Sequence, residues 1–208
     1  MAGTDPWPVI HAERKSLAAD LDGLSDQAWA TPSLCTGWTV RDVVAHMTAT
    51  SKVSGANFLP KLAASGFRFA RMQDKEVAAE RGDSPADTLA RFKARLDSTG
   101  RPPGPIDTML GEVIVHSEDI RRPLGIGHSY PTDDVVRVAN FFSGSNLIIG
   151  SKRRISGLTL RATDAEWENG TGPLVSGPVL ALVVAMTGRK AALDDLAGEG
   201  VDILRSRP

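Results

Sequence analysis

The residues of this chain best suited to chemistry lie in the stretch GEVIVHSEDIRRPLG, which begins at Gly111. Glu112 and His116 stand four residues apart, and Asp119 follows three residues later. On a helix, these spacings put the three side chains on one stripe, beside apolar residues that would face a neighbouring helix. A buried carboxylate is costly unless it is paired or binds a metal. The stripe therefore predicts either a metal site or a buried, hydrogen-bonded pair of Glu112 and His116.

A third candidate ligand, His46, lies on the apolar face of an earlier predicted helix. A helix that crosses this one would bring His46 opposite Glu112 and His116. Two neutral imidazoles and one carboxylate leave open positions for water or substrate, as in catalytic zinc sites. Asp119 could then accept a hydrogen bond from His116 and orient the ring from outside the metal's ligand set. The alternative for His46 is a core histidine whose hydrogen bonds are satisfied by its neighbours.

Helices must position these side chains, and the sequence marks where several of them begin. Thr39 and Asp42 have the spacing of a capping box, and Ser84 precedes Pro85 as an N-cap precedes the first helical position. Pro60 is expected to kink or end the helix that starts at Thr39. The predicted helices cover residues 7–22, 26–30, 39–60, 84–98, 106–124 and a segment capped by Thr132.

The pattern changes toward the C-terminus. Residues 67–83 are polar and charged, and we assign no element to them. Residues 158–163 alternate apolar and polar side chains, which predicts a strand, and ENGTG follows as a turn. The stretch GPVLALVVAMTGRKAALDDLAGEG predicts two short helices broken at Gly188. We therefore expect a mainly α protein, with a helical bundle over residues 1–150 and a small α+β region over residues 151–208.

The composition excludes several classes of function. The formal net charge is −1, which argues against a broad surface for nucleic acid. The single cysteine, Cys35, cannot form an intrachain disulfide; it is expected as a small buried side chain, with nucleophile or fourth ligand as the alternatives. The start MAGTDPWPVI has no signal-peptide pattern, and no apolar stretch is long enough to span a bilayer. We expect a soluble, cytoplasmic protein that binds neither nucleic acid nor membranes.

Two motifs carry a resemblance to a known family. The stretches LCTGWTVRDVVAHM, from Leu34, and GEVIVHSEDIRRPLG resemble the metal-binding domain of the mycothiol-dependent maleylpyruvate isomerase family, a branch of the DinB-like superfamily. The C-terminal stretch with its glycine-arginine pair is similar to the tail of these proteins. The resemblance implies a DinB-like four-helix bundle with a small C-terminal region. It also implies a divalent metal on His46, Glu112 and His116, with Asp119 beside them.

The same resemblance implies a function. The metal, zinc in the first instance with nickel or another ion as alternatives, would activate the thiol mycothiol as co-substrate. The reaction would be an S-transfer or an isomerisation of a small electrophile, with Arg189 holding a carboxylate of substrate or thiol. The alternative for Arg189 is a solvent-facing position at a helix end. No catalytic residue is identified. The alternative function is a non-catalytic helical bundle that binds metal or a small molecule, and a homodimer is one option for the oligomeric state.

Other charged residues are expected at the surface. Glu118 and Arg122 are four residues apart on the face away from the stripe, so they predict an exposed ion pair. Arg121 and Arg122 are expected to face solvent, with the holding of a substrate or thiol carboxylate as the alternative. His11 and His128 lie outside both motifs and are also expected at the surface.

Overall fold

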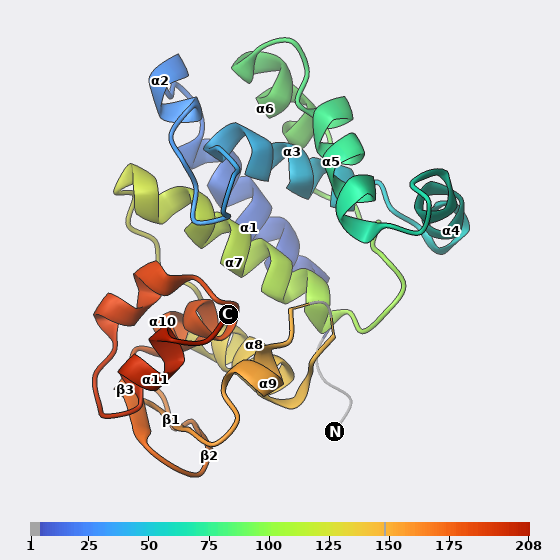
Figure 1. Ribbon diagram of the computed structural model, residues 1–208. Coiled ribbons are helices and arrows are strands. Elements are labelled where there is room, and N and C mark those ends of the chain that lie inside the picture. The colour runs from blue at the N-terminus through green and yellow to red at the C-terminus, as the bar shows by residue number, and fades with distance from the viewer. Residues whose placement is uncertain (1–4, 148) are drawn as a thin grey trace. The chain divides into compact units, whose positions relative to one another are not determined.

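A computed structural model describes residues 5–147 and 149–208 of the chain. The chain divides into two compact units, Met1–His128 and Ser129–Pro208 (Figure 1). The segment after Thr132, predicted as part of the bundle, belongs to the second unit. Within the described ranges, no helix combines the length and the apolar character that crossing a membrane requires.

The first unit is helical. α3 packs against α5, α6 and α7, and α1 packs against α7 and α6. Figure 1 shows α1 and α7 running alongside one another. The helices of this unit are α1 (Trp7–Asp20), α2 (Asp26–Trp29), α3 (Val40–Thr50), α4 (Gly55–Ala64), α5 (Phe69–Glu80), α6 (Pro85–Lys93) and α7 (Asp107–Leu124).

Local sequence signals fix several helix ends in this unit. Thr39 and Asp42 form the expected capping box at the start of α3, and Ser84 caps α6 in the same way. α7 ends at Gly125, whose φ of 67° is a left-handed conformation that glycine adopts without steric cost. These ends were predicted correctly because each depends on side chains within a few residues of the backbone groups they satisfy.

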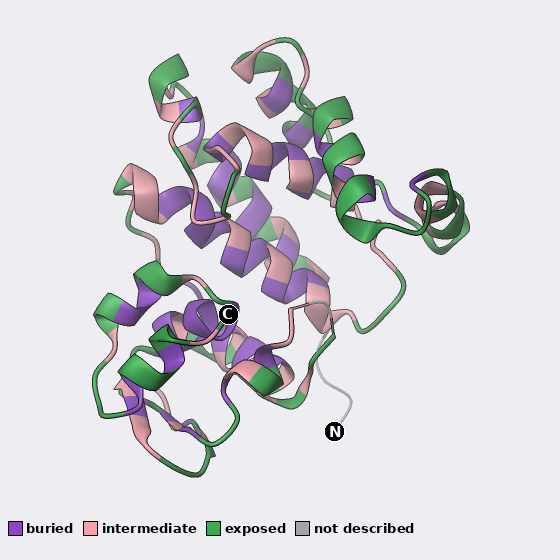
Figure 2. Cartoon of the chain, in the orientation of Figure 1, coloured by how far each residue is buried: buried purple, intermediate pink, exposed green. Residues whose placement is uncertain are grey.

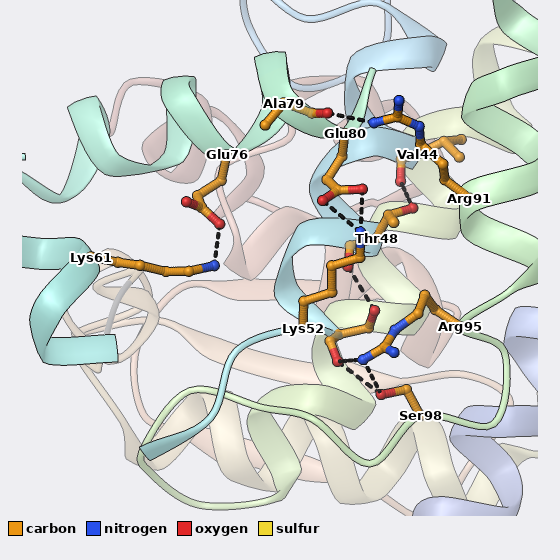
Figure 3. A network of polar contacts seen from close by, with 11 residues as sticks. Val44, Thr48, Lys52, Lys61, Glu76, Ala79, Glu80, Arg91, Arg95 and Ser98 are labelled. Atoms are coloured by element: carbon orange, nitrogen blue, oxygen red, sulfur yellow. Dashed lines mark hydrogen bonds and ion pairs between the residues drawn. The ribbon is translucent and has the colours of Figure 1, made fainter. Parts of the chain in front are cut away.

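The segment between α3 and α6 differs from the sequence prediction. Instead of one helix from Thr39 that Pro60 interrupts, the chain ends α3 at Thr50 and starts α4 with a second capping box, and Pro60 lies inside α4. The charged segment that received no element contains α5. Its Met72 and Val77 are buried, and Lys52 reaches both carboxylate oxygens of Glu80 at 2.7 Å (Figure 3). A polar helix is thus stabilised by two apolar side chains and tertiary contacts that a local pattern does not reveal.

The second unit combines helices with a small sheet. β1 lies in the middle, antiparallel to β2 and parallel to β3. α10 is buried along most of its length and packs against α8 and the sheet. The elements are α8 (Thr132–Gly144), α9 (Ser151–Arg154), β1 (Thr159–Ala162), β2 (Glu168–Gly170), β3 (Leu174–Gly177), α10 (Val179–Met186), the 3₁₀ helix η1 (Lys190–Asp195) and α11 (Val201–Arg205).

The elements of the second unit agree only in part with the sequence prediction. The first strand and the break at Gly188 are as predicted. β2 occupies the first three residues of ENGTG, which was predicted as a turn, and β3 was not foreseen. Thr132 is the first residue of α8 and not its cap; Pro131 occupies the N-cap position without a side-chain hydrogen bond. The expected fold class, mainly α with a small α+β region at the C-terminal end, is confirmed.

Candidate metal and thiol site

α7 carries the predicted stripe of polar side chains through the first unit. Most residues of this helix are buried, as its largely purple ribbon shows (Figure 2). Asp119 has no exposed surface, and the His116 side chain is 15% exposed. The prediction that the stripe faces the interior of the bundle is therefore confirmed for these two residues.

His116, Asp119 and Cys35 form a compact polar cluster. Nδ1 of His116 lies 2.9 Å from Oδ2 of Asp119. The Cys35 thiol donates to the same carboxylate oxygen at 3.0 Å, and its sulfur lies 3.8 Å from Nδ1 of His116. The loop before α3 is also fixed to α7 by its backbone, because the Leu34 amide donates to the Asp119 carbonyl. The cluster thus joins α7 to a loop more than eighty residues earlier in the chain.

His46 approaches His116 from α3. The two imidazole centroids are 4.9 Å apart, with the rings nearly perpendicular. The His46 ring also contacts the indole of Trp38, and the centroids of these two rings are 5.1 Å apart. α3 and α7 pack directly on one another, so the predicted approach of these two helices is the source of the contact.

Glu112 is the most unusual polar side chain of the site. Both of its carboxylate oxygens are buried, and neither has a hydrogen-bond partner among the described residues. Burial raises the pKa of this carboxyl, and the charges of Arg14 and His116 oppose part of the rise. The Glu112–His116 hydrogen bond, which was the alternative to a metal site, is therefore absent among the described residues, although the two groups interact electrostatically. An orphaned buried carboxylate is the feature expected where a cation belongs.

The charge of His116 is also set by the cluster. Burial works to lower the pKa of this imidazole, but the hydrogen bonds with Asp119 and Cys35 outweigh burial and raise the pKa to about 10. With Nδ1 engaged by Asp119, Nε2 is the ring nitrogen that can serve as a ligand. Metal binding at Nε2 would require loss of the proton that the metal-free cluster retains.

Two overlapping sets of candidate metal ligands share His116. One is the predicted set of His46, Glu112 and His116, and the other is formed by Cys35, His116 and Asp119. Cys35, His116 and Asp119 offer donor atoms that all lie within 4.8 Å of one another, and no other such group of three occurs among the residues that the structure describes. His46 and Glu112 are outside that group. Sequence reasoning gave Cys35 only as an alternative ligand, since a lone cysteine carries no spacing signal. Its place in the loop that leads into α3, the helix of His46, was the available hint.

Arg189 belongs to the second unit. It occupies the N-cap position of η1, and its guanidinium donates to the Thr187 carbonyl at 3.3 Å. It lines a pocket together with Arg154, Lys190 and Arg207. Arg189 therefore lies in a strongly cationic pocket of the second unit.

The structure corrects the expectation that the remaining charged groups are exposed. Arg121 is fully buried, with Nη2 2.7 Å from Oδ2 of Asp20 on α1. Glu118 and Arg122 form the predicted pair at 2.7 Å, but Glu118 is only 5% exposed. These side chains were misjudged because both sides of α7 are covered, and a helical pattern assumes that one side faces water.

The two remaining histidines are also half-buried rather than fully exposed. His11 lies 3.3 Å from the Ser98 carbonyl, and His128 lies 2.8 Å from a carboxylate oxygen of Glu13. Each ring is therefore held by a polar contact within the first unit.

Comparison with known proteins agrees with the sequence resemblance. Residues 10–101 match the family model described as mycothiol maleylpyruvate isomerase N-terminal domain, which confirms the resemblance and covers the region that contains Cys35 and His46. The chain is similar in fold to two solved structures, the mycothiol-dependent maleylpyruvate isomerase and a histidine-to-alanine mutant of that isomerase. The sequence identities are 15% and 16%, each with a TM-score of 0.64, over 97% of this chain and 94% of the other. No curated protein matches the sequence.

Proposed function

We propose that His46, Glu112 and His116 hold a divalent metal ion and that the protein is a mycothiol-dependent isomerase or S-transferase acting on a small electrophile. The observation that carries the proposal is Glu112, whose two buried oxygens have no partner within the described residues. The imidazoles of His46 and His116, on packed helices, have centroids 4.9 Å apart, and the charge of His116 acts on Glu112. A carboxylate and two imidazoles suit zinc, and nickel is compatible with the same donor set.

The chain's own residues have distinct roles in this proposal. Asp119 accepts a hydrogen bond from Nδ1 of His116 and so directs Nε2 toward the ligand position. Glu112 contributes the negative charge, and Trp38 packs against His46 and restricts the ring. The bound ion would lower the pKa of a coordinated thiol, which provides the thiolate at neutral pH.

The substrate is proposed by chemical class. A thiolate adds to an electrophilic carbon, and the adduct either isomerises before the thiol leaves or is released as a thioether. Arg189 suits a carboxylate group because a guanidinium forms forked contacts with carboxylates. The thiol is proposed as mycothiol, and the location as the cytoplasm, on the family resemblance.

The first experiment is metal analysis of protein purified without chelators or a nickel column. About one ion per chain in the wild type, and its loss in His46→Ala and Glu112→Gln, is the result expected for a three-ligand site. Glu118→Gln, on the same helix, is the matched control and should retain the metal. Wild-type protein that remains metal-free after addition of zinc would reject the site.

The second experiment separates the enzyme from a protein that only binds metal. Zinc-loaded wild type and Glu112→Gln are incubated with mycothiol and small electrophiles such as maleylpyruvate. Thiol-dependent turnover that requires Glu112 supports the enzyme. Stoichiometric metal without turnover favours the non-catalytic alternative.

A further inference from the structure

Arg14 is a buried cation in the first unit that the proposed chemistry leaves unused. It lies in the third turn of α1 and has no exposed surface. Nη1 donates to the Ser98 carbonyl at 2.8 Å. Nε and Nη2 are buried and find no acceptor in the described part of the chain. A buried guanidinium with two unused donor groups is costly, so an acceptor is expected close to it.

Glu112 is the acid whose charge acts on Arg14. α1 packs against α7, and both groups lie on these two helices. Burial lowers the pKa of Arg14, and the charge of Glu112 opposes that shift. Arg14 in turn opposes the rise in the pKa of Glu112. The buried donors of one side chain and the buried acceptors of the other are therefore complementary.

Other acids on α1 are committed elsewhere. Glu13 lies 2.8 Å from His128, and Oδ2 of Asp20 accepts from Nε of Arg121 and lies 2.7 Å from its Nη2. These contacts direct the acids of α1 toward Arg121 and His128. Glu112 is thus the carboxylate available to Arg14.

We propose that Arg14 is a positioning residue for Glu112. Its Nε and Nη2 groups bind the Glu112 carboxylate, directly or through one water, when that carboxylate binds the metal ion. The inference rests on the proposed function, which makes Glu112 a metal ligand. A charge-assisted hydrogen bond fixes the direction in which a carboxylate presents its second oxygen. Partners of this kind typically change metal affinity by about 10- to 100-fold when removed.

The anchoring of Arg14 suits this role. The Ser98 carbonyl accepts a hydrogen bond from Arg14. The Ser98 hydroxyl in turn donates to the Ser51 carbonyl at 2.8 Å. Arg95 donates to the same Ser51 carbonyl at 3.1 Å, and Figure 3 shows Arg95 and Ser98 meeting at this point. Ser51 closes α3, the helix that carries His46. One end of the guanidinium is therefore held while its remaining donors stay available for Glu112.

The test measures zinc affinity by chelator competition in the full chain. Arg14→Met is expected to weaken zinc binding by about 10- to 100-fold, and Arg14→Lys, which keeps the charge without the fork, by less. His11→Ala is the matched control, because His11 contacts the same Ser98 carbonyl at 3.3 Å. It should leave the affinity within about twofold of wild type, since it removes no partner of Glu112.

Two further readouts separate positioning from a purely structural role. The visible absorption of the cobalt-substituted protein should change in Arg14→Met, because the geometry of the carboxylate ligand changes. If the variants fail to fold, the ¹⁵N–¹H signal of Arg14 Nε in wild-type protein should shift when zinc is added. A folded Arg14→Met protein with wild-type affinity and spectrum, or an Arg14 signal that zinc does not move, overturns the inference.

The outcomes also distinguish this inference from the proposed function. Wild-type affinity in Arg14→Met rejects the positioning role and leaves the enzyme proposal in place. The expected loss of affinity supports the positioning role, whether or not thiol-dependent turnover is found. A wild-type protein that binds no metal rejects both.

Discussion

Oδ2 of Asp119 accepts hydrogen bonds from both Nδ1 of His116, at 2.9 Å, and the Cys35 thiol, at 3.0 Å. This shared oxygen fixes the orientation of the imidazole and ties the Cys35 loop to α7. It also decides which ring nitrogen is left for a ligand. The carboxylate of Asp119 is fully buried, so its interactions with these partners are weakly screened by water.

Replacing Asp119 by asparagine should weaken metal binding. The amide keeps the shape of the side chain but loses the charge, and it can donate to Nδ1 and favour the wrong tautomer. Asp119→Asn is expected to weaken zinc binding by about 10- to 100-fold in a chelator competition assay. Glu118→Gln changes the adjacent acid and should have little effect. Equal affinity in Asp119→Asn and wild type would show that Asp119 does not orient the ligand.

Removing the Cys35 thiol should distinguish the two ligand sets that share His116. If His46, Glu112 and His116 hold the ion, Cys35→Ala retains about one zinc per chain, whereas His46→Ala does not. The cobalt-substituted wild type should then lack thiolate-to-metal charge-transfer absorption in the absence of an added thiol. Loss of metal in Cys35→Ala together with retention in His46→Ala would instead assign the ion to Cys35, His116 and Asp119.

The stability of the metal-free protein should depend on the charge of His116. Its pKa is raised from 6.5 to about 10 in the folded state, so protonation of this ring stabilises the fold. That contribution is fully present below pH 6.5 and is lost as the pH rises through about 10. The difference in unfolding free energy between wild type and His116→Gln, from urea titrations, should therefore shrink as the pH rises through this range. A difference that stays constant or grows would contradict the assigned shift.

Arg121 should be critical for stability. Its guanidinium is fully buried and donates to Asp20 at 2.8 Å and to Ser16 at 3.0 Å. Arg121→Met leaves the charge of Asp20 without its partner, so we expect a loss of about 3–5 kcal/mol of unfolding free energy in urea titrations.

The control for Arg121 is an exposed ion pair. Lys93 and Asp22 lie 2.8 Å apart with side chains 40% and 64% exposed. Lys93→Met should cost about 0–1 kcal/mol, because surface pairs are screened by water. Similar losses of unfolding free energy in Arg121→Met and Lys93→Met would mean that the burial of the Arg121 ion pair adds nothing to stability.

Much of the candidate site follows from local sequence. The spacing of Glu112, His116 and Asp119 defines their common stripe, because helical periodicity is a property of neighbouring residues. Thr39 with Asp42 fixes where α3 begins, and hence the turn on which His46 lies.

The partners of those residues could not be obtained in the same way. The contact of Cys35 with Asp119, and the burial of Arg14 near Glu112, join residues that are far apart in the chain. α5 likewise packs against α3, and two of its apolar side chains are buried in the fold. The sequence by itself determined several helices, among them α1, α6 and α7, the caps of α3 and α6, and the candidate ligands, since these depend on spacing within a few turns. The tertiary structure alone decided which charges are buried and which groups they meet, because helix packing, and not residue type, sets the neighbours of a side chain.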